Sequence, residues 1–182
     1  MPEQQGILTY EGILEMFRQT DRMIQETNLQ MKETNRKISA LGSRIGEIIE
    51  HMVSGNIAAK FRNLGYDVTE LSRNRHFENK NLAIHGEIDL FLEDGDIAVL
   101  IEVKTTLETM NVRKHIERLE KYRRYTDAKG GDKRRFIGAV AGAVVTDEAA
   151  EYAQENGMYV IVQSGEAVEI VTPPDGFIAK EW

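Results

Sequence analysis

The stretch Gly86-Glu-Ile-Asp-Leu-Phe-Leu-Glu-Asp-Gly-Asp-Ile-Ala-Val-Leu-Ile-Glu-Val-Lys104 predicts two strands joined by a tight turn. Apolar residues occupy every second position from Ile88 to Leu92, as in a strand with two different faces. The turn, Glu93-Asp-Gly-Asp96, contains a glycine that can adopt a positive φ. The run from Ile97 to Val103 is almost continuously apolar, which is typical of a strand covered on both faces. We therefore predict an antiparallel hairpin whose second strand lies inside a sheet.

This second strand ends in two charged residues, Glu102 and Lys104, on either side of Val103. Because side chains alternate along a strand, Glu102 and Lys104 project from the same side of it. Charges at the end of so apolar a strand are costly unless they have partners. Asp89 is the candidate partner, since antiparallel pairing across the turn can place it beside both. The alternative is an ordinary salt bridge among solvated residues at a sheet edge.

Two carboxylates and an ammonium group converging at one end of a sheet suit the chemistry of phosphodiesters. Carboxylate oxygens are hard ligands that Mg²⁺ accepts, and Mg²⁺ usually keeps several waters and binds phosphate oxygens as well. A neighbouring lysine can orient a water, help to deprotonate it, or stabilise the negative charge that develops on a phosphate.

The order of Asp89 followed by Glu102-Val103-Lys104 on the next strand, and then by a helix, resembles the PD-(D/E)xK nuclease superfamily. This superfamily includes restriction endonucleases and archaeal Holliday junction resolvases, and some uncharacterised bacterial branches carry an N-terminal coiled coil. The resemblance covers about residues 40–162. It departs from the usual motif because Ile88, rather than proline, precedes the aspartate.

The resemblance implies a restriction-endonuclease-like α/β fold, with a mixed central sheet flanked by helices. It also implies Mg²⁺-dependent hydrolysis of nucleic acid, with DNA as the expected substrate and Mn²⁺ as a substitute metal. Asp89, Glu102 and the backbone carbonyl of Val103 would bind the metal, and Lys104 would position or activate water. In this superfamily a preceding helix often supplies a third acidic residue; Glu50 is the favoured candidate here, and Glu47 the alternative.

Basic residues after this motif suggest a surface for phosphates. The chain carries a net charge of −7, yet the segment from Lys104 to Arg135 holds 11 Lys and Arg against 5 Asp and Glu. A basic segment next to an acidic metal site favours a phosphodiester substrate, although an exposed helix can also be charged without binding anything. The candidate contacts to nucleic acid are His115, Arg118 and Tyr122 on one helix flank, and Arg73 and Arg75 in the polar segment 72–81.

The N-terminal region has a heptad pattern typical of a coiled coil. One register is apolar throughout, and its companion is mostly polar. We expect one long helix over about residues 14–41, pairing with another copy as a homodimer or higher oligomer, or else folding back on its own domain. Gly42 and Gly46 predict a break or a bend where this helix meets the globular part. The apolar register comprises Phe17, Ile24, Met31, Ile38, Ile45 and Met52, and the companion register comprises Leu14, Asp21, Asn28, Asn35, Gly42 and Ile49.

The expected domains are a tail and coiled-coil helix at 1–41, a nuclease-like domain at 42–172, and a tail at 173–182 that packs on the body or hangs free. Within the central domain we expect a helix at 45–64, a strand at 66–71 and a loop at 72–81. We expect Thr105 or Thr106 to begin the helix after the motif, and Thr146 to begin a later one. The remaining expected strands are 136–145, 158–162 and 167–171.

Composition excludes several other classes. The 182 residues contain no cysteine, so neither a disulfide framework nor a thiolate metal site is available. No apolar run approaches the length of a membrane span, and we expect a cytoplasmic protein without membrane contact. The four histidines lack zinc-type spacing.

A noncatalytic dimeric module that binds nucleic acid or protein is the alternative to a nuclease.

Overall fold

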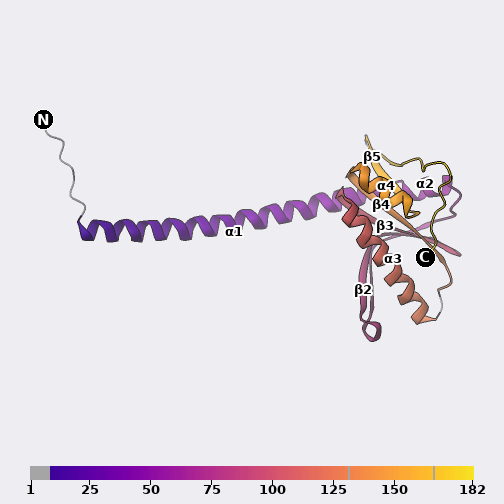
Figure 1. Ribbon diagram of the computed structural model, residues 1–182, viewed down its shortest axis with the longest axis horizontal. Helices are drawn as coiled ribbons and strands as arrows, with labels where there is room; N and C mark the ends of the chain where they lie inside the picture. The colour runs from indigo at the N-terminus through magenta and orange to yellow at the C-terminus, as the bar shows by residue number, and fades with distance from the viewer. Residues whose placement is uncertain (1–8, 131, 166) are drawn as a thin grey trace. The chain divides into compact units, whose positions relative to one another are not determined.

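The computed structural model describes residues 9–130, 132–165 and 167–182. The fold is α/β, as predicted, with a long N-terminal helix and a six-stranded mixed sheet flanked by helices (Figure 1). The helices are α1 (Tyr10–Ser54), α2 (Ile57–Asn63), the 3₁₀ turn η1 (Lys80–Leu82), α3 (Thr109–Lys129) and α4 (Asp147–Glu155). The strands are β1 (Glu70–Asn79), β2 (Ile84–Asp94), β3 (Ile97–Leu107), β4 (Arg135–Val145), β5 (Tyr159–Ser164) and β6 (Ala167–Ile170).

The order of the strands in the sheet is their order in the sequence, β1 to β6. The first three strands pair antiparallel, β3, β4 and β5 pair parallel, and β6 returns antiparallel to β5. Helices α3 and α4 connect the parallel strands, because a parallel pair requires a crossover. The predicted hairpin is β2 and β3, and Gly95 in its turn has φ 45°.

Two apolar layers cover the two faces of the sheet. One layer packs α2 and the last turns of α1 against Val99, Ile101 and Val103 of β3. The other packs α3 and α4 against the opposite face, which includes Leu100. Strand β3 is therefore covered on both sides, which explains its unbroken apolar sequence.

The chain divides into two compact units between Arg44 and Ile45. The helix does not break at Gly42 or Gly46, because α1 continues through both glycines to Ser54. One glycine inside a helix costs only about 1 kcal/mol relative to alanine, so the helical hydrogen bonds on either side maintain the helix. The predicted helix at 45–64 is instead interrupted after Ser54, and α2 begins at Ile57.

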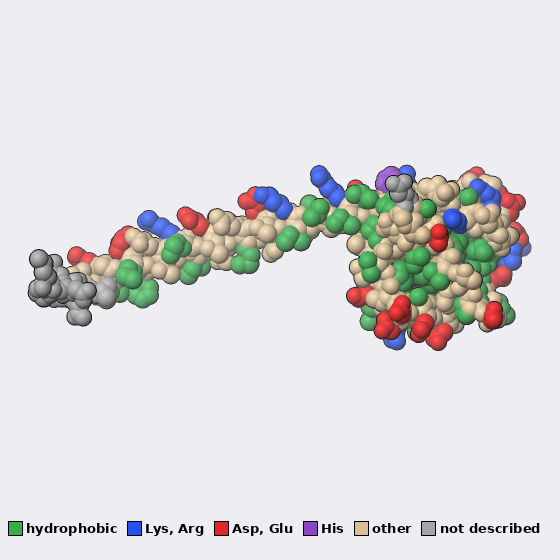
Figure 2. Space-filling model, turned by 90° about the horizontal axis from the view of Figure 1, so that it is seen from above, with side chains coloured by type: hydrophobic (Ala, Val, Ile, Leu, Met, Phe, Trp, Pro, Cys, Tyr) green, Lys and Arg blue, Asp and Glu red, His purple; other side chains and the backbone are tan. Residues whose placement is uncertain are grey.

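Apolar side chains are exposed along α1 within residues 9–44. Figure 2 shows them as green groups along this helix. Phe17, Ile24, Met31 and Ile38 of the predicted apolar register are 66%, 53%, 54% and 63% exposed. Within the described part of this unit, these apolar side chains have no apolar surface to pack against.

The predicted loop at 72–81 is wrong, and so is the start of the strand before it. Residues Glu70–Asn79 form the edge strand β1, paired with β2 along its length. Only Phe77 of this strand is buried. A polar edge strand gives almost no apolar alternation, so the ladder to β2 determines its conformation.

The helix after the motif also begins later than predicted. Thr105 and Thr106 belong to β3, whose parallel ladder with β4 continues to Leu107. Helix α3 begins at Thr109, and the backbone N–H of Glu108 donates to Asn111 Oδ1 at 2.9 Å. The prediction for Thr146 is confirmed, because its hydroxyl accepts from the N–H of Ala149 at the start of α4.

The C-terminal segment packs on the body. The backbone N–H of Trp182 donates to the carbonyl of Phe136 at 3.0 Å, and that of Lys180 to the carbonyl of Gly157 at 3.0 Å. The Trp182 ring lies over Gly138 of β4, whose missing side chain leaves room for it.

We predict that Gly138→Ala lowers the free energy of unfolding by about 1–3 kcal/mol through overpacking. The added Cβ would lie 2.7 Å from Leu119 Cδ1 and 2.9 Å from Met158 Cγ. Urea unfolding followed by tryptophan fluorescence measures the change, since the chain has one tryptophan. The control is Gly42→Ala, whose Cβ would meet nothing within 4 Å and which should cause no loss. Equal stability of the two variants would contradict the packing assigned to Gly138.

Candidate functional site

The candidate site lies where β2 separates from β3. The ladder between these strands ends at the pair Leu90 and Ile101. One residue further, the carboxylate of Asp89 replaces the missing backbone partner, and its Oδ2 accepts from the N–H of Val103 at 2.7 Å. The aspartate is thereby fixed at the opening between the two strands, with its carboxylate against β3.

Glu102 is the only carboxylate buried as a whole residue in the described part of the chain, at 2% exposure. Its Oε1 lies 2.6 Å from Lys104 Nζ, and its Oε2 is paired with Arg118 of α3. A buried carboxylate is tolerated only when it is paired and hydrogen-bonded, and both of its oxygens have a cationic partner here. These two partners set the orientation of the carboxylate.

The ammonium of Lys104 is the point on which the site converges. It lies 2.6 Å from Glu102 Oε1, 3.0 Å from the carbonyl oxygen of Val103 and 3.5 Å from Asp89 Oδ2. Three oxygens from two strands therefore surround one positive charge. Asp89, Glu102 and Lys104, which the sequence suggested as a group, are together in space.

Glu50, near the end of α1, belongs to the same electrostatic environment. Burial raises the pKa of its carboxyl, and the negative charges of Asp89 and Glu87 raise it further. Lys104 acts in the opposite direction. Of the two glutamates considered from the sequence, Glu50 is half-buried, whereas Glu47 is exposed.

Two of the residues expected to contact nucleic acid are instead in the core. His115 is completely buried, with Nε2 3.1 Å from the carbonyl oxygen of Leu100, and burial lowers the pKa of its imidazole to about 4. Tyr122 is 3% exposed and packs edge-on against Phe77 and Phe136. Both lie on the side of α3 that faces the sheet, so neither offers a surface to a ligand.

The other three expected contacts are placed differently. Arg118 is directed at Glu102 and is partly exposed. Arg75 is paired with Glu93 at 2.7 Å, and its guanidinium lies over the Phe91 ring. Arg73 is exposed on β1, with its NH1 2.7 Å from His51 Nδ1.

Much of the basic segment is neutralised by the protein itself. Besides Arg118, three of its arginines form ion pairs: Arg123 with Asp127, Arg134 with Glu93 and Asp132, and Arg135 with Asp96 and Glu181. The local excess of positive charge therefore overstates the charge available to a ligand.

The sequence did not indicate two features of the site. The pairing of Arg118 with Glu102 depends on how α3 is rotated against the sheet, which no local pattern reveals. The second feature is Glu87, which adds to the acidic environment of Glu50. In the sequence, the sign of its involvement was its position two residues before Asp89.

Within residues 9–130, 132–165 and 167–182, no three His, Asp or Glu side chains are arranged so that they could hold a metal ion together. The oxygens around Lys104 come from two carboxylates and one backbone carbonyl, so a site built from them would depend on main-chain oxygen and water. No helix in the described ranges combines the length and the apolar character that crossing a bilayer requires.

Comparisons with known proteins give structural likeness only. No protein-family model matches the chain. No curated protein sequence matches it either. The solved structures that it resembles include a repair endonuclease from Pyrococcus abyssi, with 16% identity, a TM-score of 0.43, and coverage of 69% of this chain and 47% of that one.

Two further solved structures are similar to the chain. One is a protein of unknown function, with 17% identity, a TM-score of 0.40, and coverage of 67% of this chain and 58% of that one. The other is EndoMS in a complex with dsDNA, with 18% identity, a TM-score of 0.36, and coverage of 64% of this chain and 45% of that one. The chain spans about half the length of the solved proteins it matches. Likeness at this level does not assign an activity.

We predict that Glu50→Gln stabilises the metal-free protein at neutral pH. The pKa of Glu50 is raised in the folded state, so the folded protein binds this proton more tightly than the unfolded chain does. The ionised carboxylate of Glu50 therefore destabilises the folded protein. This destabilisation is fully present above the pKa that Glu50 has in the folded protein, and it disappears as the pH falls below the pKa that Glu50 has in the unfolded chain. Thermal unfolding in EDTA at several pH values should show a higher Tm for Glu50→Gln at pH 7 and a shrinking difference toward pH 4.

The control for this prediction is Glu47→Gln, on the exposed side of the same helix. It should change the Tm little at any pH. If both variants behave alike, Glu50 does not experience the acidic environment of Asp89 and Glu87.

Proposed function

We propose that the protein is a Mg²⁺-dependent nuclease that hydrolyses phosphodiester bonds in DNA. The observation that carries the proposal is the convergence of Asp89, Glu102 and the Val103 carbonyl on the ammonium of Lys104. These are the groups that the resemblance to PD-(D/E)xK nucleases assigns to metal binding and water activation. A buried glutamate beside a lysine at a strand end has no evident structural purpose that an apolar pair would not serve as well.

The residues present fit a divalent ion of the magnesium type. The surrounding oxygens are hard donors, and the position that they surround already accommodates a positive charge. Mg²⁺ is commonly held by one or two carboxylates with water and phosphate oxygens completing its shell, and Mn²⁺ accepts the same donors. When bound, such an ion makes water a better nucleophile and offsets charge on the phosphate.

The remaining groups of the site support these ligands. Arg118 holds one oxygen of Glu102, and the Val103 N–H holds one oxygen of Asp89, so both carboxylates are oriented by their partners. Lys104 supplies a movable positive charge for a water or a phosphate oxygen. Glu50 adds a third carboxyl, whose raised pKa suits a group that accepts or holds a proton near the site.

Nuclease activity is tested with supercoiled plasmid and with labelled single-stranded, duplex and branched DNA, in Mg²⁺ and separately in Mn²⁺. We predict that Asp89→Asn and Lys104→Met each lower the cleavage rate about 10²-fold or more, because they remove a charge from the site while nearly preserving its shape. Circular dichroism checks that both variants fold. The control is Glu120→Gln, an exposed residue on α3, which should cleave like the wild type.

One observation favours a noncatalytic module instead. Both oxygens of Glu102 are engaged by cationic side chains, and the described residues contain no ready cluster of three metal-binding side chains. Such a module would keep the acidic group only as an internal salt bridge. The decisive outcome is wild-type protein that binds one of the DNA substrates but cleaves none of them in either Mg²⁺ or Mn²⁺. That result would establish the noncatalytic module and refute the nuclease proposal.

We also propose that α1 pairs with a second copy of the chain. The exposed apolar residues of its predicted register support this, since an isolated helix of this kind does not remain exposed in water. The hydroxyls of Thr20 and Thr27 donate to the carbonyls of Met16 and Met23 in their own helix. Thr20 and Thr27 lie beside the two registers, and because their hydroxyls are already bonded they leave no unsatisfied donor next to the seam.

Sedimentation equilibrium tests this pairing. We predict that the double variant Ile24→Glu, Ile38→Glu is a monomer at concentrations where the wild type is a dimer or higher oligomer, because two charges would be buried in the seam. The matched control, Gln25→Glu with Ser39→Glu, adds the same charges one residue away and should keep the wild-type state. A monomeric wild type would contradict the proposal.

A further inference from the structure

Charge is distributed unevenly around the axis of helix α3. At 3.6 residues per turn, one flank about 80° wide holds four cations and no carboxylate, and we call it the basic flank. Its cations are Lys114, Arg118, Lys121 and Lys129. The other charged residues of the helix balance as three basic and three acidic, namely Arg113, Glu117, Glu120, Arg123, Arg124 and Asp127. The excess positive charge of α3 is therefore confined to the basic flank.

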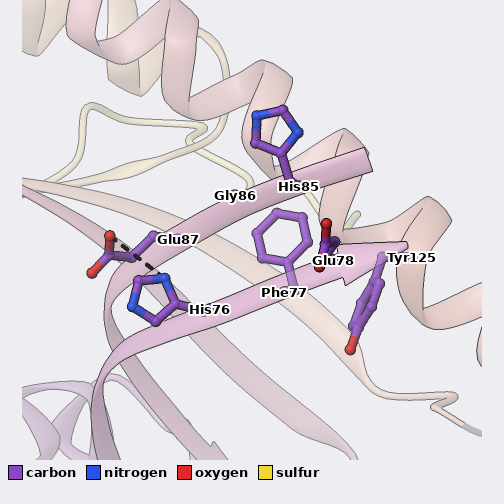
Figure 3. Close-up of a pocket in the computed structure, with 7 residues that line it drawn as sticks. All are labelled: His76, Phe77, Glu78, His85, Gly86, Glu87 and Tyr125. Atoms are coloured by element: carbon purple, nitrogen blue, oxygen red, sulfur yellow. Dashed lines mark ion pairs between the residues drawn. The ribbon is translucent and has the colours of Figure 1, made fainter. Parts of the chain in front are cut away.

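Contacts at two points place the basic flank beside the proposed catalytic site. Arg118 is paired with Glu102. Seven residues later, Tyr125 lies on the same flank and packs against Phe77 of β1, with ring centroids 5.4 Å apart (Figure 3). Lys129 Nζ in turn lies 4.6 Å from the centre of the Tyr125 ring. The basic flank therefore borders the site at Glu102 and the two-stranded ribbon of β1 and β2 at Tyr125.

The three lysines of this flank keep their charge free for a ligand. Lys114, Lys121 and Lys129 are exposed. Within the described ranges, the lysines that form ion pairs are Lys37 and Lys104. This part of the basic segment is therefore not neutralised by the protein, unlike its paired arginines.

The carboxylates of the neighbouring ribbon project away from the basic flank. His76 lies opposite Glu87, and Glu78 opposite His85, in the antiparallel pair of β1 and β2. Because faces alternate along a strand, these four side chains lie on the face opposite to Phe77, which packs on α3. His76 Nδ1 is 3.7 Å from Glu87 Oε2 on that other face (Figure 3).

The length of the basic flank suits a polymer of negative charges. Lys114 and Lys129 are fifteen residues apart, or about 22 Å along the helix axis. One strand of B-DNA carries one phosphate charge per about 3.4 Å of its axis, so a row of this length can follow several phosphates of one strand.

We infer that the basic flank binds the phosphodiester backbone of the DNA strand that is cleaved at Asp89 and Glu102; this inference rests on the nuclease proposal. Lys114, Lys121 and Lys129 contact phosphate oxygens on the strand as it passes along α3. Such contacts fix the position of a strand without reading its bases, so binding through this flank is independent of sequence.

The salt dependence of DNA binding tests this inference. Fluorescence anisotropy of the full-length protein in EDTA measures the Kd of a labelled single strand and of a labelled duplex at several NaCl concentrations. Losing one phosphate contact makes the slope of log Kobs against log salt less steep by about 0.7 for a single strand and about 0.9 for a duplex. We expect this change for Lys114→Gln and for Lys121→Gln, with equal weakening for oligonucleotides of unrelated sequence.

Two control variants separate the basic flank from net charge. Arg124→Gln removes one positive charge from an exposed position of α3 that lies off the flank, and it should leave the slope unchanged. Lys121→Arg keeps the charge on the flank and should also bind with the wild-type slope.

Lysine footprinting provides a second readout in the wild type. Bound DNA should protect Lys114, Lys121 and Lys129 from acetylation by an N-hydroxysuccinimide ester, as read by mass spectrometry. Lys180, which is exposed on the C-terminal segment, should be acetylated equally with and without DNA.

The possible failures are distinguishable. A wild type that binds no oligonucleotide refutes the inference, and if it also cleaves none, the nuclease proposal falls with it. If DNA binds but Arg124→Gln changes the slope as much as Lys121→Gln, or the three lysines are not protected, the basic flank alone is refuted. If poly-glutamate displaces DNA as readily as unlabelled DNA does, the flank is a general anion surface and the inference is refuted.

Discussion

The hydrogen bond between the Val103 N–H and Asp89 is the contact on which the arrangement of the candidate site depends. A regular hairpin would have continued its ladder past Leu90 and used the backbone of β2 to bond Val103. Because a side chain takes over that bond, the strands separate without leaving a buried N–H unsatisfied. The opening gives Lys104 room to reach oxygens from both strands.

Burial and charge are balanced around this opening. Glu102 lies near the end of the apolar strand β3, and two cationic side chains, Lys104 and Arg118, contact its carboxylate. The pKa of Glu50 rises because of burial and the neighbouring carboxylates, and Lys104 offsets this rise only in part. A site that concentrates acids in this way is stable only to the extent that positive charge is available to it, whether from Lys104 and Arg118 or from a bound cation.

The sequence predicted the parts of the molecule that leave a local pattern. The hairpin followed from alternation, a glycine turn and a continuous apolar run, and the grouping of Asp89 with Glu102 and Lys104 followed from its register.

Strand β1 could not be predicted, because only Phe77 of its ten residues is buried and its conformation comes from the partner strand. The inward position of His115 was missed for a similar reason, since the rotation of α3 is decided by packing against the sheet. The helix does not break at Gly42 and Gly46, because a helix with many hydrogen bonds tolerates the small loss of stability, about 1 kcal/mol, that each glycine causes.

The identical order of strands in the sheet and in the sequence has a consequence for how the chain assembles. Each strand finds its partner in the strand immediately before it, so a nascent chain can extend one growing edge without waiting for distant segments. The bridge between Ile137 and Glu181 is different, because it joins β4 to the final residues after both β5 and β6 have been added. The segment around Glu181 would then close over a sheet whose six strands are already paired, and it would add stability after the sheet has formed rather than start its formation.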